Sequence, residues 1–135
     1  MDEEIRLAAF QWLEQQALSH KDFFPRSILE RGFTFKNERI TLVGPRGIWK
    51  PKNLSLPLSI TTIANGPYED SAEGNFLTYQ YRGTDPYHSD NVGLRELMER
   101  KIPLIYFFGF AKGKYAPAWP VFIQSDNMLE LNFRV

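Results

Sequence analysis

The segment "PLIYFFGF" at residues 103–110 is the most hydrophobic strand candidate of the chain and constrains the fold more than any other stretch. It contains no charged side chain, and its apolar residues follow one another without polar positions between them. Such a continuous apolar run is typical of a strand that is buried on both faces. The sequence therefore predicts a central strand at residues 103–110.

Two helices are predicted before this strand in the sequence. Apolar residues recur along the N-terminal segment with the spacing of one helix face, which predicts a helix from about Asp2 to Leu18. A second, shorter helix is expected over roughly 91–100, with Leu94, Leu97 and Met98 turned inward. Asp90 is a suitable N-cap for that second helix.

Further β-rich runs complete the pattern. The segment "FTFKNERITLV" is interpreted as a hairpin with its turn near Lys36–Asn37. An acidic loop at 65–74 is expected to be exposed. The remaining strands are expected at residues 58–64, 76–82, 120–124 and 129–135. The sequence predicts one α+β domain over residues 1–135, with a mixed or antiparallel sheet flanked by the N-terminal helix and the short helix near 91–100.

The overall composition excludes several classes of protein. No apolar run approaches the roughly 20 residues of a membrane helix, so no membrane association is expected. The chain has no Cys, which excludes disulfides and thiolate metal sites and fits a cytoplasmic location. The acidic start of the chain is unlike a secretory signal.

The charge is unevenly distributed although the net charge is zero. Residues 26–52 carry seven basic residues against two acidic ones, a net charge of +5. A local basic stretch is what contacts to phosphate need, and Arg46, Lys50 and Lys52 are the candidates. The alternative is an ordinary solvated surface loop.

The sequence argues against catalysis. A two-histidine zinc site would need both histidines, His20 and His88, and His20 closes the first helix. Asp85, His88 and Asp90 could be imagined as a metal triad, but Asp85 precedes a proline in a turn and Asp90 is better used as a cap. We therefore expect no catalytic residue, no metal and no cofactor.

The loop "YRGTDPYHSDN" at residues 81–91 offers several donors at the end of a strand. Arginine and histidine can donate to the acceptor edge of guanine, and asparagine can pair with adenine. The candidates for base readout are Arg82, His88, Ser89 and Asn91. The alternative is a structural turn, in which Asp85 and Asn91 bond the backbone and Arg82 pairs with Asp85.

The segment "KGKYAPAWPVF" at residues 112–122 contains two prolines beside two lysines. Proline cannot donate to a β-ladder, so the segment is a poor start for an ordinary central strand.

Several stretches together resemble the sulfur-binding domain of type IV restriction endonucleases, HNH nucleases that recognise phosphorothioate-modified DNA. These stretches are "LVGPRGIWKP", "PLSI", "YQYRGTDPYHSDNVGLRELM", "IPLIYFFGFAKGKY" and "WPVFI", and they cover roughly residues 40–124. The HNH module has no counterpart in this chain, so the resemblance implies either a recognition domain whose nuclease module follows residue 135 or a stand-alone reader. Its expected partner is double-stranded DNA with a phosphorothioate, and two half-sites would be compatible with a homodimer.

The resemblance also implies DNA contacts from the loop equivalent to Arg82–Asn91 and a shallow apolar cavity for the sulfur. The cavity matches Tyr115, Pro117, Ala118, Trp119 and Pro120, with Pro120 favoured as its floor. Sulfur is softer and less strongly hydrated than oxygen, so it loses less free energy of hydration when it is buried without a hydrogen-bond donor. The lysines Lys112 and Lys114 would attract modified and plain backbones alike.

Two alternatives remain open. The chain could read methylated or otherwise modified bases by stacking a flipped base on Trp119 or Tyr115. It could also be a protein–protein interaction domain with a proline- and aromatic-rich surface.

Overall fold

The computed structural model of the chain describes residues 2–64, 71–73 and 76–135. Most of the predicted acidic loop, residues 65–70 and 74, lies outside the described residues. In chain order the elements are α1 (Asp2–Ser19), β1 (Phe24–Pro25), α2 (Arg26–Arg31), β2 (Phe33–Phe35), β3 (Glu38–Ile40), β4 (Ile48–Trp49), β5 (Ser59–Ile63), β6 (Ser71–Glu73), β7 (Phe76–Gln80), α3 (Ser89–Arg100), β8 (Leu104–Ala111), β9 (Lys114–Val121), β10 (Ser125–Asn127) and β11 (Asn132–Arg134).

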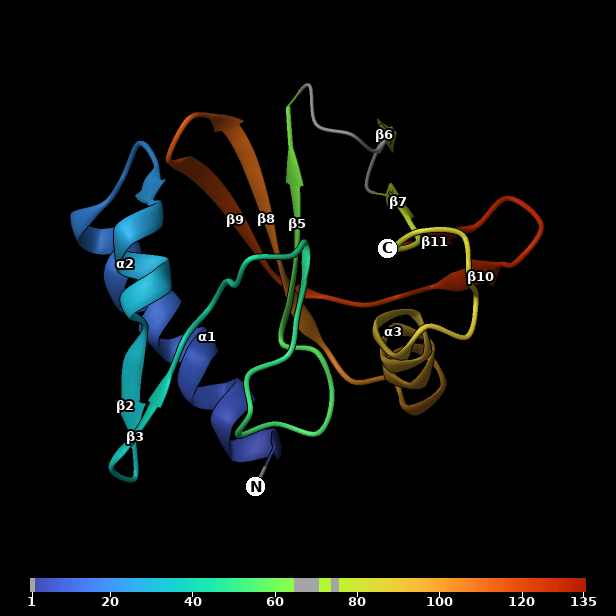
Figure 1. Cartoon of the computed structure of the whole chain (residues 1–135). Coiled ribbons are helices and arrows are strands. Elements are labelled where there is room, and N and C mark those ends of the chain that lie inside the picture. The colour runs from blue at the N-terminus through green and yellow to red at the C-terminus, as the bar shows by residue number, and fades with distance from the viewer. Residues whose placement is uncertain (1, 65–70, 74–75) are drawn as a thin grey trace.

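The main sheet is mixed and has the strand order β1-β9-β8-β5-β4. The pair β5 and β8 is parallel, whereas β8 with β9, β9 with β1 and β4 with β5 are antiparallel. The strand at residues 104–111 therefore lies at the centre of the sheet, as its apolar sequence predicts. It is not buried on both faces along its whole length, because Phe108 and Phe110 are 38% and 43% exposed. The α+β class and the N-terminal helix are confirmed (Figure 1).

A second, antiparallel sheet has the order β10-β11-β7-β6 and contains the last residues of the chain. In Figure 1 it lies on the side of the main sheet opposite to α1 and α2, next to α3. The hairpin of β2 and β3 forms a separate two-stranded ribbon. Its turn is at Lys36 and Asn37, both with positive φ, which is the conformation of a two-residue hairpin loop.

Two apolar cores lie on opposite sides of the main sheet. The first joins α1 and α2 to the sheet and includes Ile5, Leu13, Leu29, Ile105 and Phe107. The second joins the sheet to α3 and to the C-terminal strands and includes Ile60, Tyr81, Leu94, Leu97, Leu104 and Phe133. Complete burial of one such leucine stabilises the fold by about 1.5–3 kcal/mol. The predicted inward face of the second helix is confirmed at Leu94 and Leu97, while Met98 is partly buried.

The proline-containing segment corrects one prediction. Residues 114–121 form an eight-residue strand, so a strand begins well before the predicted start at residue 120. The ladder with β8 shifts register between the pairs Leu104–Val121 and Tyr106–Ala118, which leaves Trp119 and Pro120 in a bulge. The peptide bond between these two residues is cis. Proline is tolerated here because, at bulges and strand edges, the β-ladder does not require a hydrogen bond from every backbone N–H.

Candidate nucleic-acid interface

The loop at residues 81–91 is held in shape by the side chain of Asn91. Its Oδ1 accepts a hydrogen bond from the Arg82 backbone N–H at 2.8 Å, and its Nδ2 donates to the carbonyls of Arg82 and Asp85 at 3.0 and 2.9 Å. Asn91 is fully buried. Its amide is occupied by the backbone, so the structure does not leave Asn91 available for the predicted pairing with a base.

Asp90 holds two arginines together beside this loop. Its Oδ2 lies 2.9 Å from Nη1 of Arg82 and 3.7 Å from Nε of Arg46. The Asp90 side chain is 11% exposed, whereas those of Arg82 and Arg46 are 35% and 48% exposed. The cluster thus carries one more positive than negative charge, with the cations on the solvent side. The predicted partner of Arg82, Asp85, instead accepts from the backbone N–H of Tyr87.

Arg46 reaches Asp90 because its own loop is tied down on both sides. The carbonyl of Gly44 accepts from Arg26 at 2.8 Å, and the carbonyl of Gly47 accepts from the Thr61 N–H at 2.9 Å. A Cβ at Gly47 would lie 2.7 Å from the hydroxyl of Tyr79, so the backbone approaches the neighbouring strand closely there. The structure therefore brings a predicted phosphate contact, Arg46, next to a predicted base contact, Arg82.

His88 rather than Asp90 caps α3, which corrects the predicted N-cap. Its Nδ1 accepts from the Asp90 N–H at 3.1 Å. The neutral ring must then carry its proton on Nε2, so that Nε2 is a donor. His88 is half-buried, and its neighbours Tyr87 and Ser89 are exposed, Tyr87 at 73%. His88 and Ser89 thus keep donors that could meet a base edge.

A second ionic cluster supports the loop from the C-terminal sheet. Asp126 accepts from the hydroxyl of Tyr81 and from Nε of Arg95, and Arg95 also donates to the Pro86 carbonyl at 3.2 Å. Burial raises the pKa of the Tyr81 hydroxyl, and its bond to the Asp126 carboxylate raises it further. Sequence reasoning missed Arg95 and Asp126, since no local motif links residues on α3 and β10.

The five predicted cavity residues do not converge. Tyr115 is buried, and its hydroxyl accepts from Arg26 at 2.9 Å. Trp119 is partly buried and packs against the first core, on the same side as Tyr115. Side chains of a strand alternate between its two faces, so Ala118 lies on the opposite face, where it is exposed; Pro120 is also exposed. The five side chains are thus divided between the two faces of β9, and the sulfur contact at Pro120 stays a prediction.

The predicted lysine contacts lie apart from the arginine cluster. Lys112 and Lys114 are exposed at the turn between β8 and β9, which Figure 1 shows at the end of the sheet away from α3. Lys114 lies over the ring of Phe23, 5.0 Å from its centre. Lys50 donates to the Leu54 carbonyl at 3.0 Å, and Lys52 is exposed in the same loop. Only Arg46 of the five predicted phosphate contacts belongs to the arginine cluster.

The described residues offer neither a metal site nor a membrane-spanning helix. No group of three or more His, Asp or Glu side chains there could hold a metal ion. No described helix is long and apolar enough to cross a membrane.

The fold is similar to that of a solved domain. The crystal structure of the SRA domain of SUVH5 in complex with methylated CHH DNA superimposes with a TM-score of 0.53 and 17% sequence identity. The match covers 83% of this chain and 90% of that chain. No family model matches the sequence. No curated protein matches it either.

Proposed function

We propose that this chain binds double-stranded DNA that carries a chemical modification, and that it acts as a reader rather than as an enzyme. The observation that carries the proposal is the likeness in fold to an SRA domain whose structure was determined with methylated DNA. The likeness spans most of both chains, so it concerns the whole architecture rather than one shared motif.

The arginine cluster supports the proposal locally. Arg46 and Arg82 share one carboxylate, so each keeps N–H groups for another acceptor. A guanidinium can bind a phosphate oxygen through charge-assisted hydrogen bonds, which are stronger than neutral ones. DNA phosphates would compete with Asp90 for these cations. His88, Ser89 and Tyr87 then lie beside the phosphate contacts, where they could reach a groove.

A modified base is the first candidate for the feature that is read, because the DNA in the similar structure is methylated. A phosphorothioate is the second, and a different observation favours it. Ala118 and Pro120 are exposed, and Ala118 lies beside Tyr106 in the ladder. A surface of alanine and proline offers few hydrogen-bond donors. A phosphate oxygen placed on it loses its hydrating water without gaining a donor, whereas a phosphorothioate sulfur loses less free energy of solvation.

A binding panel tests the function and the modification together. Fluorescence anisotropy would be measured with four duplexes of one sequence: plain, cytosine-methylated, hydroxymethylated and phosphorothioate. We expect one modified duplex to bind at least tenfold more tightly than the plain duplex. Binding of all four with equal affinity would contradict a reader of modification, and no binding to any of them would contradict the DNA-binding function.

The second candidate makes a separate prediction about Pro120. Replacement of Pro120 by Ala introduces an N–H and removes apolar surface. If sulfur lies there, the ratio of phosphorothioate to plain affinity should fall by roughly tenfold, or about 1.4 kcal/mol. The plain duplex is the internal control. An unchanged ratio would exclude Pro120 as the sulfur contact and leave the modified base as the feature that is read.

A further inference from the structure

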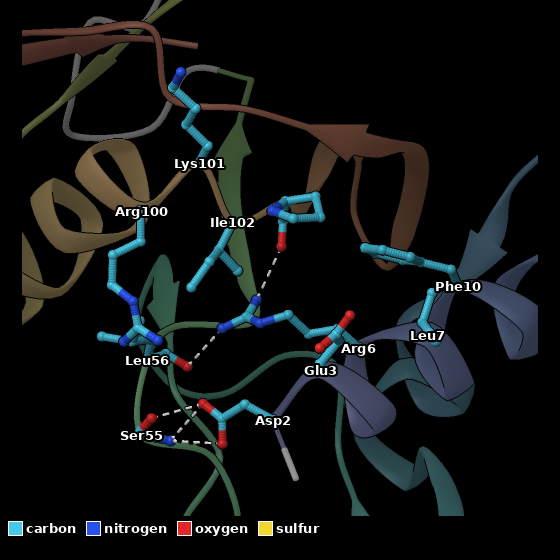
Figure 2. A pocket seen from close by; sticks show the side chains of 11 residues that line it. Asp2, Glu3, Arg6, Leu7, Phe10, Ser55, Leu56, Arg100, Lys101 and Ile102 are labelled. Carbon is cyan, nitrogen blue, oxygen red and sulfur yellow. Dashed lines mark hydrogen bonds between the residues drawn. The ribbon is translucent and has the colours of Figure 1, made fainter.

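A pocket of about 630 Å³ lies between the start of α1 and the residues that follow α3. Figure 2 shows Leu7 and Phe10 on its α1 side and Leu56 and Ile102 across from them, with the Arg6 side chain between the two groups. Its volume is in the range of small-molecule sites, and its walls are mainly apolar. The pocket is formed by elements other than the arginine cluster that we assign to DNA.

Arg6 is an unusual residue to find in such a place. It is 3% exposed, and Nη1 donates to the Pro103 carbonyl at 3.1 Å. Nη2 donates to the carbonyls of Leu56 and Pro57 at 3.2 and 2.7 Å. Its Nε has no hydrogen-bond partner in the described part of the chain. The guanidinium is thus partly bonded by neutral carbonyls while its charge is buried.

The charge of Arg6 is not neutralised by a close carboxylate. Burial lowers the pKa of Arg6 to about 10, and the charge of Asp2 opposes this shift only in part. The Asp2 carboxylate instead accepts from the hydroxyl and the N–H of Ser55, at 2.7 and 3.1 Å to Oδ2 (Figure 2). On the opposite wall Arg100 forms an exposed pair with Glu96. Glu3, which is exposed, is the remaining acid of the pocket.

We propose that this pocket binds a small carboxylate with an apolar body. The carboxylate would supply the negative charge that the buried guanidinium lacks, and the apolar body would contact Leu7, Phe10 and Ile102. Burial of an unneutralised charge is costly, and a bound anion offsets that cost. The three hydrogen bonds to carbonyls fix the position of the Arg6 guanidinium. They supply no negative charge, so a cation without a counterion remains beside the apolar pocket.

The test compares 3-phenylpropanoate with 3-phenylpropanamide, which has the same shape and no charge. Binding to the whole chain would be followed by methyl chemical shifts and by the melting temperature. We expect the acid to bind with a dissociation constant of about 0.1–1 mM and to shift the Leu7, Leu56 and Ile102 methyl signals. The amide should bind at least tenfold more weakly. Equal binding of the two, or shifts that lie elsewhere, would overturn the proposal.

Two variants separate the pocket from general effects. Arg6→Met should abolish the preference for the acid; a folded Arg6→Met that still prefers the acid would overturn the proposal. Leu7→Ser alters the wall at a position that is 55% exposed and should weaken binding by roughly tenfold while the fold is retained. Leu18→Ser on the same helix, 76% exposed and outside the pocket, is the matched control and should leave binding unchanged. Equal binding by both serine variants would also contradict the site.

A further pair of probes identifies the source of the carboxylate. A tripeptide that ends in phenylalanine with a free C-terminus would be compared with its C-terminal amide. Tighter binding of the free tripeptide than of 3-phenylpropanoate would identify a peptide C-terminus as the natural ligand. The reverse order would identify a free small molecule.

Discussion

Replacement of Arg46 and Arg82 together by methionine is expected to weaken DNA binding by about a hundredfold or more, for plain and modified duplexes alike. Each arginine is proposed to bind a phosphate, and a hydrogen bond to a charged group contributes about 1.5–3 kcal/mol. Because phosphate contacts carry no sequence information, the preference for modification should be retained. The dependence of log K on log salt should decrease by about 1 for each arginine lost. Titrations at several salt concentrations measure both effects.

The control for this prediction is Arg31→Met. Arg31 is an exposed arginine at the end of α2, and its loss changes the net charge without touching the cluster. It should change the salt dependence little. If the double variant and Arg31→Met behave alike, Arg46 and Arg82 contribute only through net charge, and the proposed interface is wrong.

Replacement of Asn91 by alanine is expected to give a large loss of stability, about 3 kcal/mol. The substitution removes three hydrogen bonds from a fully buried amide and leaves the N–H and carbonyl of Arg82 and the carbonyl of Asp85 without their partner. An unsatisfied buried group costs about 1–3 kcal/mol, and these part-buried groups are expected at the low end of that range. The melting temperature should fall by roughly 10 °C. DNA affinity, measured well below that temperature, should fall as well, because Arg82 loses its fixed position.

Asn53→Ala is the matched control for Asn91. The Asn53 side chain donates to Glu38 at 3.0 Å on the surface, so its loss should change stability by less than about 0.5 kcal/mol. A melting temperature of Asn91→Ala within a degree or two of the parent would show that the loop does not depend on this amide. Loss of DNA affinity without loss of stability would restore Asn91 as a direct contact.

Local patterns predicted several elements of the fold well. The helix of α1 follows from its apolar spacing, and the hairpin turn follows from Asn37, a residue that tolerates positive φ. The central position of β8 follows from a run of apolar residues with no polar face. Each of these properties depends on residues within one short segment, so the local sequence pattern is sufficient to predict it.

The site was less predictable because its contacts join distant segments. The loop carrying Arg46 and the end of α3 carrying Asp90 meet only in the folded chain, and the sequence suggested a cap for Asp90 instead. The residues of the predicted cavity illustrate the same point. The prediction treats neighbouring residues of one segment as one surface, but an extended strand sends Tyr115 into the core and Ala118 to the opposite face. Sequence proximity does not give spatial proximity when the segment is extended.

The prolines of β9 have a consequence for self-association. In the described structure β1 pairs only with Lys114 and Tyr115, so the rest of the outer edge of β9 is not covered by a strand. An uncovered edge can recruit a strand from another molecule and start aggregation. Pro117 and Pro120 have no N–H to offer such a strand, which interrupts the ladder at two positions. The edge that carries these prolines is thus protected against cross-molecular sheet extension, and any dimer of this domain is expected to form through a different surface.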